Sequence, residues 1–454
     1  MQLLAWIGLC FAVAFLLRNR PTAAIICIIA LWFFVPTVGS YLLTGQRIGP
    51  LTFHAATWLT FAVICVQMVQ DPRSLLNAVA RNSYLFLILL LVLATSLLTT
   101  RTVQTGGGIV LLTDQMIVPA VLFLLIISVG GNSPTLVYTL RNFLFLFASI
   151  VTLIAMWQWS SQSVLLYESG FLTQFWFNPE TQRWMGTFDQ PLALSLVLCA
   201  LMPLLAGVRR LFLAVPMLAL FMAGVMITQS RVGMIVASAG AVYAIAFSRH
   251  RRSIKALVLT LVGVGFVGLL ASPLAAGILE RVADDTGSTE ARNKAYGVFA
   301  RDWEQYFFTG QGVTSSYEIS EYAGLQTSFE SSVLMYAVDI GIFFAILYFG
   351  LLLFVVLRNH SRHHVPGLTI AGLVVAIIPH TYSGLATRSV AGVVVWTVVA
   401  MTVIAAQRSV GNPRIRTSAG QRPRSPADED VLPDSAAQLK PRHSIGSDTS
   451  WIGR

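Results

Sequence analysis

The sequence predicts an all-α polytopic membrane protein with about 12 or 13 transmembrane helices. Of its 454 residues, 56% are hydrophobic and only 11% are charged, whereas about 25% of the residues in a soluble protein are charged. Apolar runs long enough to span a bilayer recur along the chain. These runs do not alternate with a period of two, and backbone polar groups in hydrocarbon must be paired, so helices are favoured over a barrel.

The apolar runs define the expected spans in chain order. The first run has no basic start and no small-residue cleavage site, so we expect it to be a span and not a cleaved signal sequence. Several runs are short, and boundaries read from sequence shift by a few residues. The expected spans cover residues 2–17, 22–38, 51–69, 84–98, 115–129, 139–157, 190–207, 211–228, 232–248, 255–273, 329–357, 367–385 and 389–406.

Basic residues concentrate in alternate loops, which indicates that those loops face the cytoplasm. Examples are Arg18 with Arg20, Arg209 with Arg210, and the group at 249–255. The net charge of +10 therefore reflects topology, and we expect no nucleic-acid partner. The four cysteines lie within expected spans and lack the spacing of metal ligands, so we expect no metal or other cofactor.

The chain divides into a transmembrane domain over 1–406 and a tail over 407–454. The tail is rich in Pro, Ser and charged residues and is expected to be disordered and cytoplasmic. Outward-facing polar stretches are expected at 158–189 and 274–328. Within the second, the aromatic residues of 290–308 recur at spacings of three and four, which predicts an amphipathic helix on the membrane surface or over a cavity. A flexible stretch is expected to follow that helix.

Four arginines in predicted outward-facing positions run against the charge bias: Arg183, Arg231, Arg292 and Arg388. A guanidinium near hydrocarbon is costly unless it is paired or faces water, and its donor fork matches phosphate oxygens. Arg231 lies in a turn too tight for it to reach far. Arg183 and Arg388 also fit the alternative of interfacial side chains that extend toward water.

Glu330 is the carboxylate best placed to act as a general base, because it lies at the outer mouth of the run 331–357. The alternative is an acid favoured by the dipole at a helix N-terminus. Asp339, further into the same run, and His380 are secondary candidates, and each also fits a structural role inside the bundle.

Several segments, in this order, resemble the O-antigen ligase and O-antigen polymerase superfamily of bacterial envelope glycosyltransferases. The resemblance covers about 183–350 and includes RWMGTFDQP at 183–191, TQSR at 228–231, Arg292 with the aromatic helix, TGQG at 309–312 and the run from Glu330 to Gly341. It implies a multi-pass protein of the bacterial cytoplasmic (inner) membrane with a GT-C-like fold. It also implies metal-independent, inverting transfer of a glycan from an undecaprenyl diphosphate carrier at the outer face, in polysaccharide biosynthesis.

By this resemblance Arg231 and Arg292 hold the diphosphate and Arg183 lies near the same cavity. Lipopolysaccharide ligases typically carry a His-Asn pair where this chain has Glu330-Ser331, so polymerase-like activity is favoured over transfer to lipid A-core. The expected partners are a polyprenyl diphosphate-linked oligosaccharide donor, a glycan or lipid-glycan acceptor, membrane lipid and a chain-length regulator.

Two other readings are open from the sequence. A transporter or flippase of an anionic lipid-linked glycan would also use arginines in a cavity, although along a path across the bilayer. A non-catalytic scaffold of a polysaccharide assembly would use the tail 407–454 as its docking element.

Overall fold

The computed structural model describes residues 1–103, 107–174, 177, 183–248, 250–270, 286–325, 328–360 and 365–410. Every regular element in these ranges is a helix, so the predicted all-α class is confirmed. The sequence predicts a disordered tail over 407–454, but the last helix extends to Val410; from 411 onward the tail lies outside the described residues.

Sixteen helices carry most of the described chain: α1 (Gln2–Leu16), α2 (Pro21–Phe34), α4 (Ala55–Gln70), α5 (Pro72–Arg81), α6 (Ser83–Val103), α8 (Val118–Asn132), α9 (Leu136–Ser161), α11 (Pro191–Leu201), α12 (Leu211–Ile227), α13 (Arg231–Ala246), α14 (Arg252–Leu270), α16 (Thr286–Asp302), α18 (Ser332–Ile340), α19 (Ile342–Asn359), α20 (Leu368–Ile377) and α21 (Val390–Val410). Shorter helical segments join them: η1 (Thr37–Gly39), α3 (Tyr41–Thr44), α7 (Gly108–Leu112), the π-helical η2 (Thr113–Ile117), α10 (Glu168–Phe171), η4 (Met202–Gly207), η5 (Trp303–Tyr306), α17 (Ser315–Tyr322), η7 (Ile378–His380) and η8 (Ser383–Ala386).

The described helices fall short of the predicted number of full-length spans. Five are long and apolar enough to cross a membrane, and a bent pair makes a sixth. The five cover Ser83–Arg101, Gly108–Asn132, Leu136–Ser161, Ile342–Asn359 and Val390–Gln407. Six shorter apolar helices coincide with other predicted runs. The chain is therefore a helical protein with several candidate membrane spans, and many predicted runs form helices shorter than a full span.

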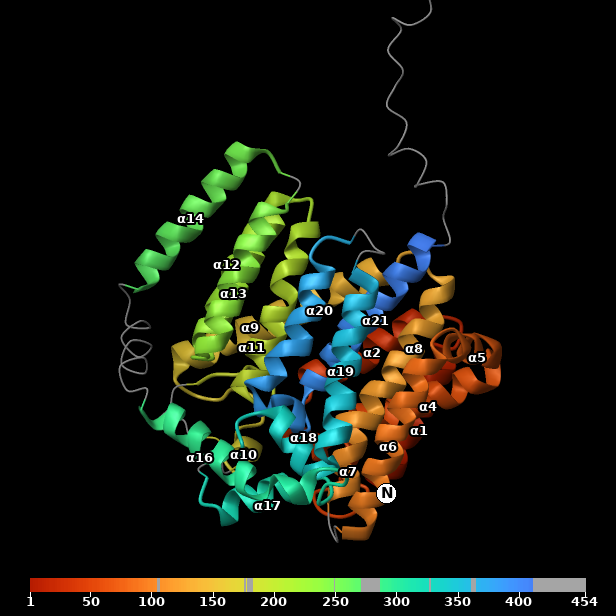
Figure 1. Cartoon of the computed structure of the whole chain (residues 1–454). Coiled ribbons are helices and arrows are strands. Elements are labelled where there is room, and N and C mark those ends of the chain that lie inside the picture. The colour runs from red at the N-terminus through yellow and green to blue at the C-terminus, as the bar shows by residue number, and fades with distance from the viewer. Residues whose placement is uncertain are drawn as a thin grey trace, which may run out of the picture. The chain divides into compact units, whose positions relative to one another are not determined.

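The centre of the bundle is α21, which packs against α8, α19 and α20 (Figure 1). Valine and alanine dominate this helix, and Val393, Val394 and Val395 are completely buried in succession. A helix that is apolar all round belongs in an interior. Trp396 joins α21 to α8 by an edge-on contact with Phe123, with ring centroids 5.1 Å apart.

The α2 run is bent by 93° at a break between Phe34 and Thr37. Side chains bind the backbone groups that the break releases, as they must at membrane depth. Thr187 Oγ1 donates to Phe33 O at 2.6 Å, and His54 Nε2 lies 2.7 Å from Val35 O. Asp189 Oδ1 accepts from Thr37 N–H at 2.7 Å. The break is therefore closed by its neighbours.

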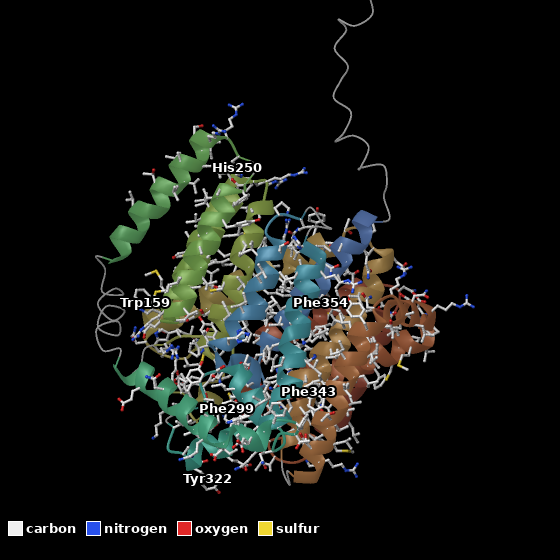
Figure 2. All side chains as sticks on the ribbon, viewed as in Figure 1. Trp159, His250, Phe299, Tyr322, Phe343 and Phe354 are labelled. Carbon is white, nitrogen blue, oxygen red and sulfur yellow. The ribbon has the colours of Figure 1, made fainter. Side chains whose placement is uncertain are left out.

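Two predictions about the outer loop and the following run need correction. The amphipathic helix is present as α16, but it ends at Asp302 and continues only as the single turn η5. The stretch after Gly312, predicted to be flexible, contains the helix α17. Directly before it, Gln311 N–H donates to Val338 O and Gly312 N–H donates to Asp339 O, both at 2.9 Å. Figure 2 shows Phe299 of α16 and Tyr322 of α17 near the end of the bundle opposite His250.

The predicted continuous helix over 329–357 is divided at Gly341, which has φ 100° and separates α18 from α19. The loop before α17 packs against this division. A Cβ at Gly341 would lie 2.8 Å from Phe308 O, so the close approach of the loop requires glycine here. Asp339 consequently belongs to the short helix α18, Glu330 lies just before it, and neither belongs to the candidate span Ile342–Asn359.

Candidate functional site

Arg231 begins α13 directly after a turn of three residues, Thr228, Gln229 and Ser230. Ser230 caps the helix, because its Oγ accepts a hydrogen bond from Gly233 N–H at 3.0 Å. Gln229 has φ 52°, a left-handed conformation that makes the turn tight. The predicted tight turn is present, and it fixes the backbone from which Arg231 projects.

Arg183 lies beside the same turn. Its Nε donates to Thr228 O at 3.1 Å. The residues after it anchor the segment: Trp184 is buried, and Gly186 exchanges two hydrogen bonds with the side-chain amide of Gln158, at 2.8 and 2.9 Å. Two predicted phosphate-binding arginines, Arg183 and Arg231, therefore share one rigid turn.

Tyr382 joins this turn to the start of α18. Its phenol OH is hydrogen-bonded to Ser230 Oγ and lies 3.2 Å from Ser195 Oγ. Its backbone carbonyl accepts from Ser332 N–H at 2.8 Å and from Ser332 Oγ at 2.5 Å. Ser230 directly precedes Arg231, and Ser332 follows Glu330 by two residues. One residue thus links the backbone beside the arginine to the backbone beside the acid.

Arg292 of α16 pairs with Glu330. Its Nε lies 3.4 Å from Glu330 Oε2. Arg292, Ala295 and Phe299 share one face of α16 by their spacing of three and four. Ala295 is fully buried, which shows that this face turns toward the rest of the protein. The side chains of Arg292 and Glu330 are 42% and 30% exposed, so the ion pair remains open to solvent and to a ligand.

The backbone of Glu330 is strained. Its φ is 52°, a conformation that costs an L-residue roughly 1–2 kcal/mol and that gathers at functional sites. The N-cap of α18 is Ser331, whose Oγ accepts from Leu334 N–H at 3.4 Å. Glu330 therefore precedes the cap and does not lie in the first helical turn, which weakens the alternative that it serves the helix dipole.

Asp339 is buried on α18 and binds the neighbouring loop. Its carboxylate accepts from Ser316 N–H at 2.8 Å and from Ser316 Oγ at 3.1 Å. Both bonds hold α17 against α18, which is a structural role. His380 lies exposed at the end of η7, with its ring 5.8 Å from Phe349 of α19. None of its contacts among the described residues joins it to Glu330 or to the arginines.

Arg388 belongs to a separate polar cluster. Its guanidinium pairs with Asp114, with Nε and a terminal nitrogen both 2.8 Å from Oδ2, and also donates to Thr52 O at 2.5 Å. Asp114 is completely buried and additionally accepts from Thr57 Oγ1 at 2.6 Å and from His54 N–H at 2.9 Å. Arg388 is thus committed to a buried carboxylate.

Sequence reasoning missed two acids and one tyrosine. Asp114 is an acid within an apolar run, which is itself a functional or structural signal, and it lies in the π-helical turn η2. Asp189 was part of the motif at 183–191, yet its partner, Thr37, is far away in the sequence. The bridging role of Tyr382 depends on three helices that meet only in the fold, so no local pattern could reveal it.

Comparison of the chain with protein-family models finds no match, and comparison with curated protein sequences finds none either. The resemblance to the O-antigen ligase and polymerase superfamily therefore stays a prediction.

Proposed function

We propose that the chain is an integral-membrane glycosyltransferase that moves a glycan from a polyprenyl diphosphate carrier to a glycan acceptor. One observation carries the proposal: Arg292 and Glu330 approach to 3.4 Å, and Tyr382 ties the backbone beside Glu330 to the turn that holds Arg183 and Arg231. These contacts link the start of α13, α16 and the segment before α18, which supports a site that combines cations with one accessible acid. This combination suits a reaction in which a diphosphate leaves and a hydroxyl loses a proton.

In the proposed reaction, an acceptor hydroxyl oxygen attacks the anomeric carbon of the donor sugar. The bond between that carbon and the phosphate oxygen breaks, and its electron pair stays on the diphosphate. Arg231 and Arg292, with Arg183 beside them, stabilise the negative charge that develops there. Glu330 accepts the hydroxyl proton. Attack opposite the leaving group inverts the anomeric centre.

The ion pair between Arg292 and Glu330 would change partners when the donor binds. Exposed ion pairs of this kind contribute only about 0–1 kcal/mol, so a diphosphate with more charge competes well for the guanidinium. Transfer of Arg292 to the diphosphate frees the Glu330 carboxylate for the acceptor hydroxyl. The arrangement therefore favours binding of donor before acceptor.

Polymerase-like transfer, with a second glycan repeat unit as acceptor, is favoured over ligation to lipid A-core. The basis is the carboxylate at position 330 in place of the His-Asn pair of the ligases that the chain resembles. We place the reaction at the outer face of the bacterial inner membrane, with a GT-C-like arrangement of helices.

The deciding experiment supplies purified protein with a synthetic undecaprenyl diphosphate-linked repeat unit in the presence of a chelator. Longer lipid-linked products are expected from the wild type. Glu330→Gln keeps the shape of the side chain but removes the base, and we expect the transfer rate to fall roughly 10²- to 10⁴-fold. Arg231→Ala and Arg292→Ala are expected to weaken donor binding in the same preparation.

Glu321→Gln is the matched control, because Glu321 is an exposed acid of α17 whose side chain forms no hydrogen bond or ion pair among the described residues. It should extend glycans at the wild-type rate. Wild-type product lengths from Glu330→Gln would remove this carboxylate from the mechanism, and unchanged donor affinity in both arginine variants would remove the phosphate role.

A transporter or flippase of the same lipid-linked glycan is the second candidate, and the bent α2 favours it, since transporters use discontinuous helices at their substrate sites. The backbone groups at this break are, however, bound by Thr187, His54 and Asp189. Movement of the donor across vesicles without any new glycosidic bond would decide for transport.

A further inference from the structure

Two adjoining cavities lie where α1, α4 and α8 end and α2 and α5 begin. The larger has a volume of about 480 Å³ and the smaller about 170 Å³. The larger falls within the range of roughly 300–1,000 Å³ typical of sites for small ligands. Both are lined by Asp71, Ser74 and Asn132, so they adjoin, and together we call them the α2–α5 recess.

The recess lies at the start of α2, where Pro21 lines it, whereas the other end of α2 is bound by Thr187 from the segment that begins with Arg183. Asn132 is the last residue of the candidate span Gly108–Asn132, and Asp114, the partner of Arg388, lies near its first turn. A span of 25 residues measures about 37 Å along its axis. By the distribution of basic loops, the recess is at the predicted cytoplasmic interface.

The charge of the recess is positive. Arg20 lines the larger cavity, Arg73 and Arg81 line the smaller, and Asp71 is the acid among the lining residues. None of the three arginines forms an ion pair with an acid in the part of the chain that the structure describes. Asp71 Oδ1 is already used as the cap of α5, where it accepts from Ser74 N–H at 3.1 Å.

The side-chain amide of Gln67 is a polar group that faces the recess. Its side chain lines the larger cavity and is only 9% exposed. Its carboxamide has no hydrogen-bond partner among the described residues. The amide N–H groups can therefore donate to an oxygen acceptor of a ligand in the recess.

The recess also has apolar lining residues, and exposed apolar side chains are close in sequence to residues that line it. Ile26 and Val129 line the larger cavity. Met68 and Val69, next to Gln67 at the end of α4, are 60% and 85% exposed, and Leu76 of α5 is 67% exposed. A ligand with an anionic head and an apolar body would match both sides at once.

We propose that the α2–α5 recess binds the headgroup of an anionic phospholipid at the predicted cytoplasmic face. The guanidiniums of Arg20 and Arg73 bind the phosphate, since basic recesses between helices on this side of a membrane suit acidic headgroups. The carboxamide of Gln67 donates to a headgroup oxygen. A free phosphate compound shares this chemistry but does not use the apolar side.

The test is a thermal-stability and native mass-spectrometry titration of the purified full chain in detergent. The probes are phosphatidylglycerol, phosphatidylcholine with the same acyl chains, and inorganic phosphate. Phosphatidylglycerol alone is expected to raise the melting temperature and to persist as a bound adduct. The double variant Arg20→Gln/Arg73→Gln is expected to lose about tenfold or more in phosphatidylglycerol affinity.

Arg209→Gln/Arg210→Gln is the matched control, because these exposed arginines lie on the same predicted face and do not line the recess. Gln67→Leu tests the site without altering charge, and it should keep the fold and weaken binding. Equal stabilisation by phosphatidylcholine, a double variant no weaker than its control, or stabilisation by inorganic phosphate alone would each overturn the proposal. Glycosyl transfer is assayed separately with the Glu330 variant, so the two proposals fail independently.

Discussion

At the residue scale, Tyr382 makes two sets of contacts, one through its side chain and one through its backbone. Its phenol binds Ser230 and Ser195, while its carbonyl binds Ser332. The first set positions the start of α13, and the second positions the start of α18. Gly233 makes room for this contact, since a Cβ there would lie 2.0 Å from Ser195 Oγ and 2.9 Å from the Tyr382 phenol oxygen.

Tyr382→Phe should remove the side-chain contacts and keep the backbone contact. It removes the bonds to Ser230 and Ser195 but leaves the carbonyl that holds Ser332. Arg231 is then no longer held in position relative to Glu330, and misplacement of a group by about 1 Å can lower the rate roughly 10²-fold. We expect kcat for glycan transfer to fall by about 10- to 100-fold, measured with donor at saturation.

A purely structural tyrosine would behave differently. In that case the melting temperature of Tyr382→Phe would drop while kcat per folded molecule stayed at the wild-type value. Tyr322→Phe is a suitable control, because Tyr322 is 92% exposed and should change neither quantity.

At the element scale, the loop before α17 is locked to α18 by backbone contact. Gly310 lies so close that a Cβ would be 2.2 Å from the carbonyl carbon of Asp339 and 2.4 Å from Ile340 N. The bonds from Gln311 and Gly312 to Val338 and Asp339 continue the contact. The loop before α17 therefore supports α18, the helix that directly follows Glu330.

Gly310→Ala should push this loop away from α18. The added methyl meets backbone atoms, which cannot rotate aside, so we expect a loss of about 1–3 kcal/mol in stability together with reduced transfer. Melting temperatures in detergent and transfer rates at matched protein amounts measure both effects.

Gly297→Ala provides the comparison, since a Cβ at Gly297 meets nothing within 4 Å. Alanine in this helical position should be neutral or stabilise by about 0.4–1 kcal/mol. An equally harmless Gly310→Ala would show that the loop and α18 are not locked together.

The elements were predictable to the extent that local pattern determines them. Apolar runs gave most helices, and aromatic spacing gave α16. The division at Gly341 was not predictable, because the apolar run continues through this residue. The division arises from the close approach of the loop at Phe308, which is a tertiary contact that the pattern of the run does not contain. From the sequence, Arg292 and Glu330 could be assigned only to the same proposed site, and their direct contact could not be predicted. Tyr382 and Asp114 acquire their partners through tertiary packing, which no local pattern reveals.

At the scale of the whole molecule, buried polar contacts join distant parts of the chain. Asp189 binds the break in α2 through Thr37 N–H, and Thr37 Oγ1 donates to the carbonyl of Arg388 at 2.7 Å. Burial raises the pKa of the Asp189 carboxyl to about 7, against the weaker opposing effects of the Thr37 hydrogen bonds and the Arg388 charge. The fold therefore favours the protonated form of this acid.

The sign of the pH dependence follows from that pKa. Because the folded value of about 7 exceeds the unfolded value of about 3.9, the folded state binds the additional proton between them, and stability falls as pH rises through this window. Asp189→Asn keeps the acceptor for Thr37 and removes the titration. We expect the variant to gain melting temperature relative to wild type at pH 8 and to gain much less at pH 4. A difference that is constant across this range would exclude Asp189 as the source.

The closed break in α2 also limits how the molecule can open. Thr187 and Asp189, which cover the break, lie in the same segment as Arg183. Moving this segment outward would break the hydrogen bonds of main-chain groups at the break, where little water is available to replace them. The segment that carries Arg183 is thus held in place by the contacts that cover the break. The side chains of Arg292 and Glu330 are 42% and 30% exposed, so a bulky carrier-linked sugar would reach the proposed site from their side.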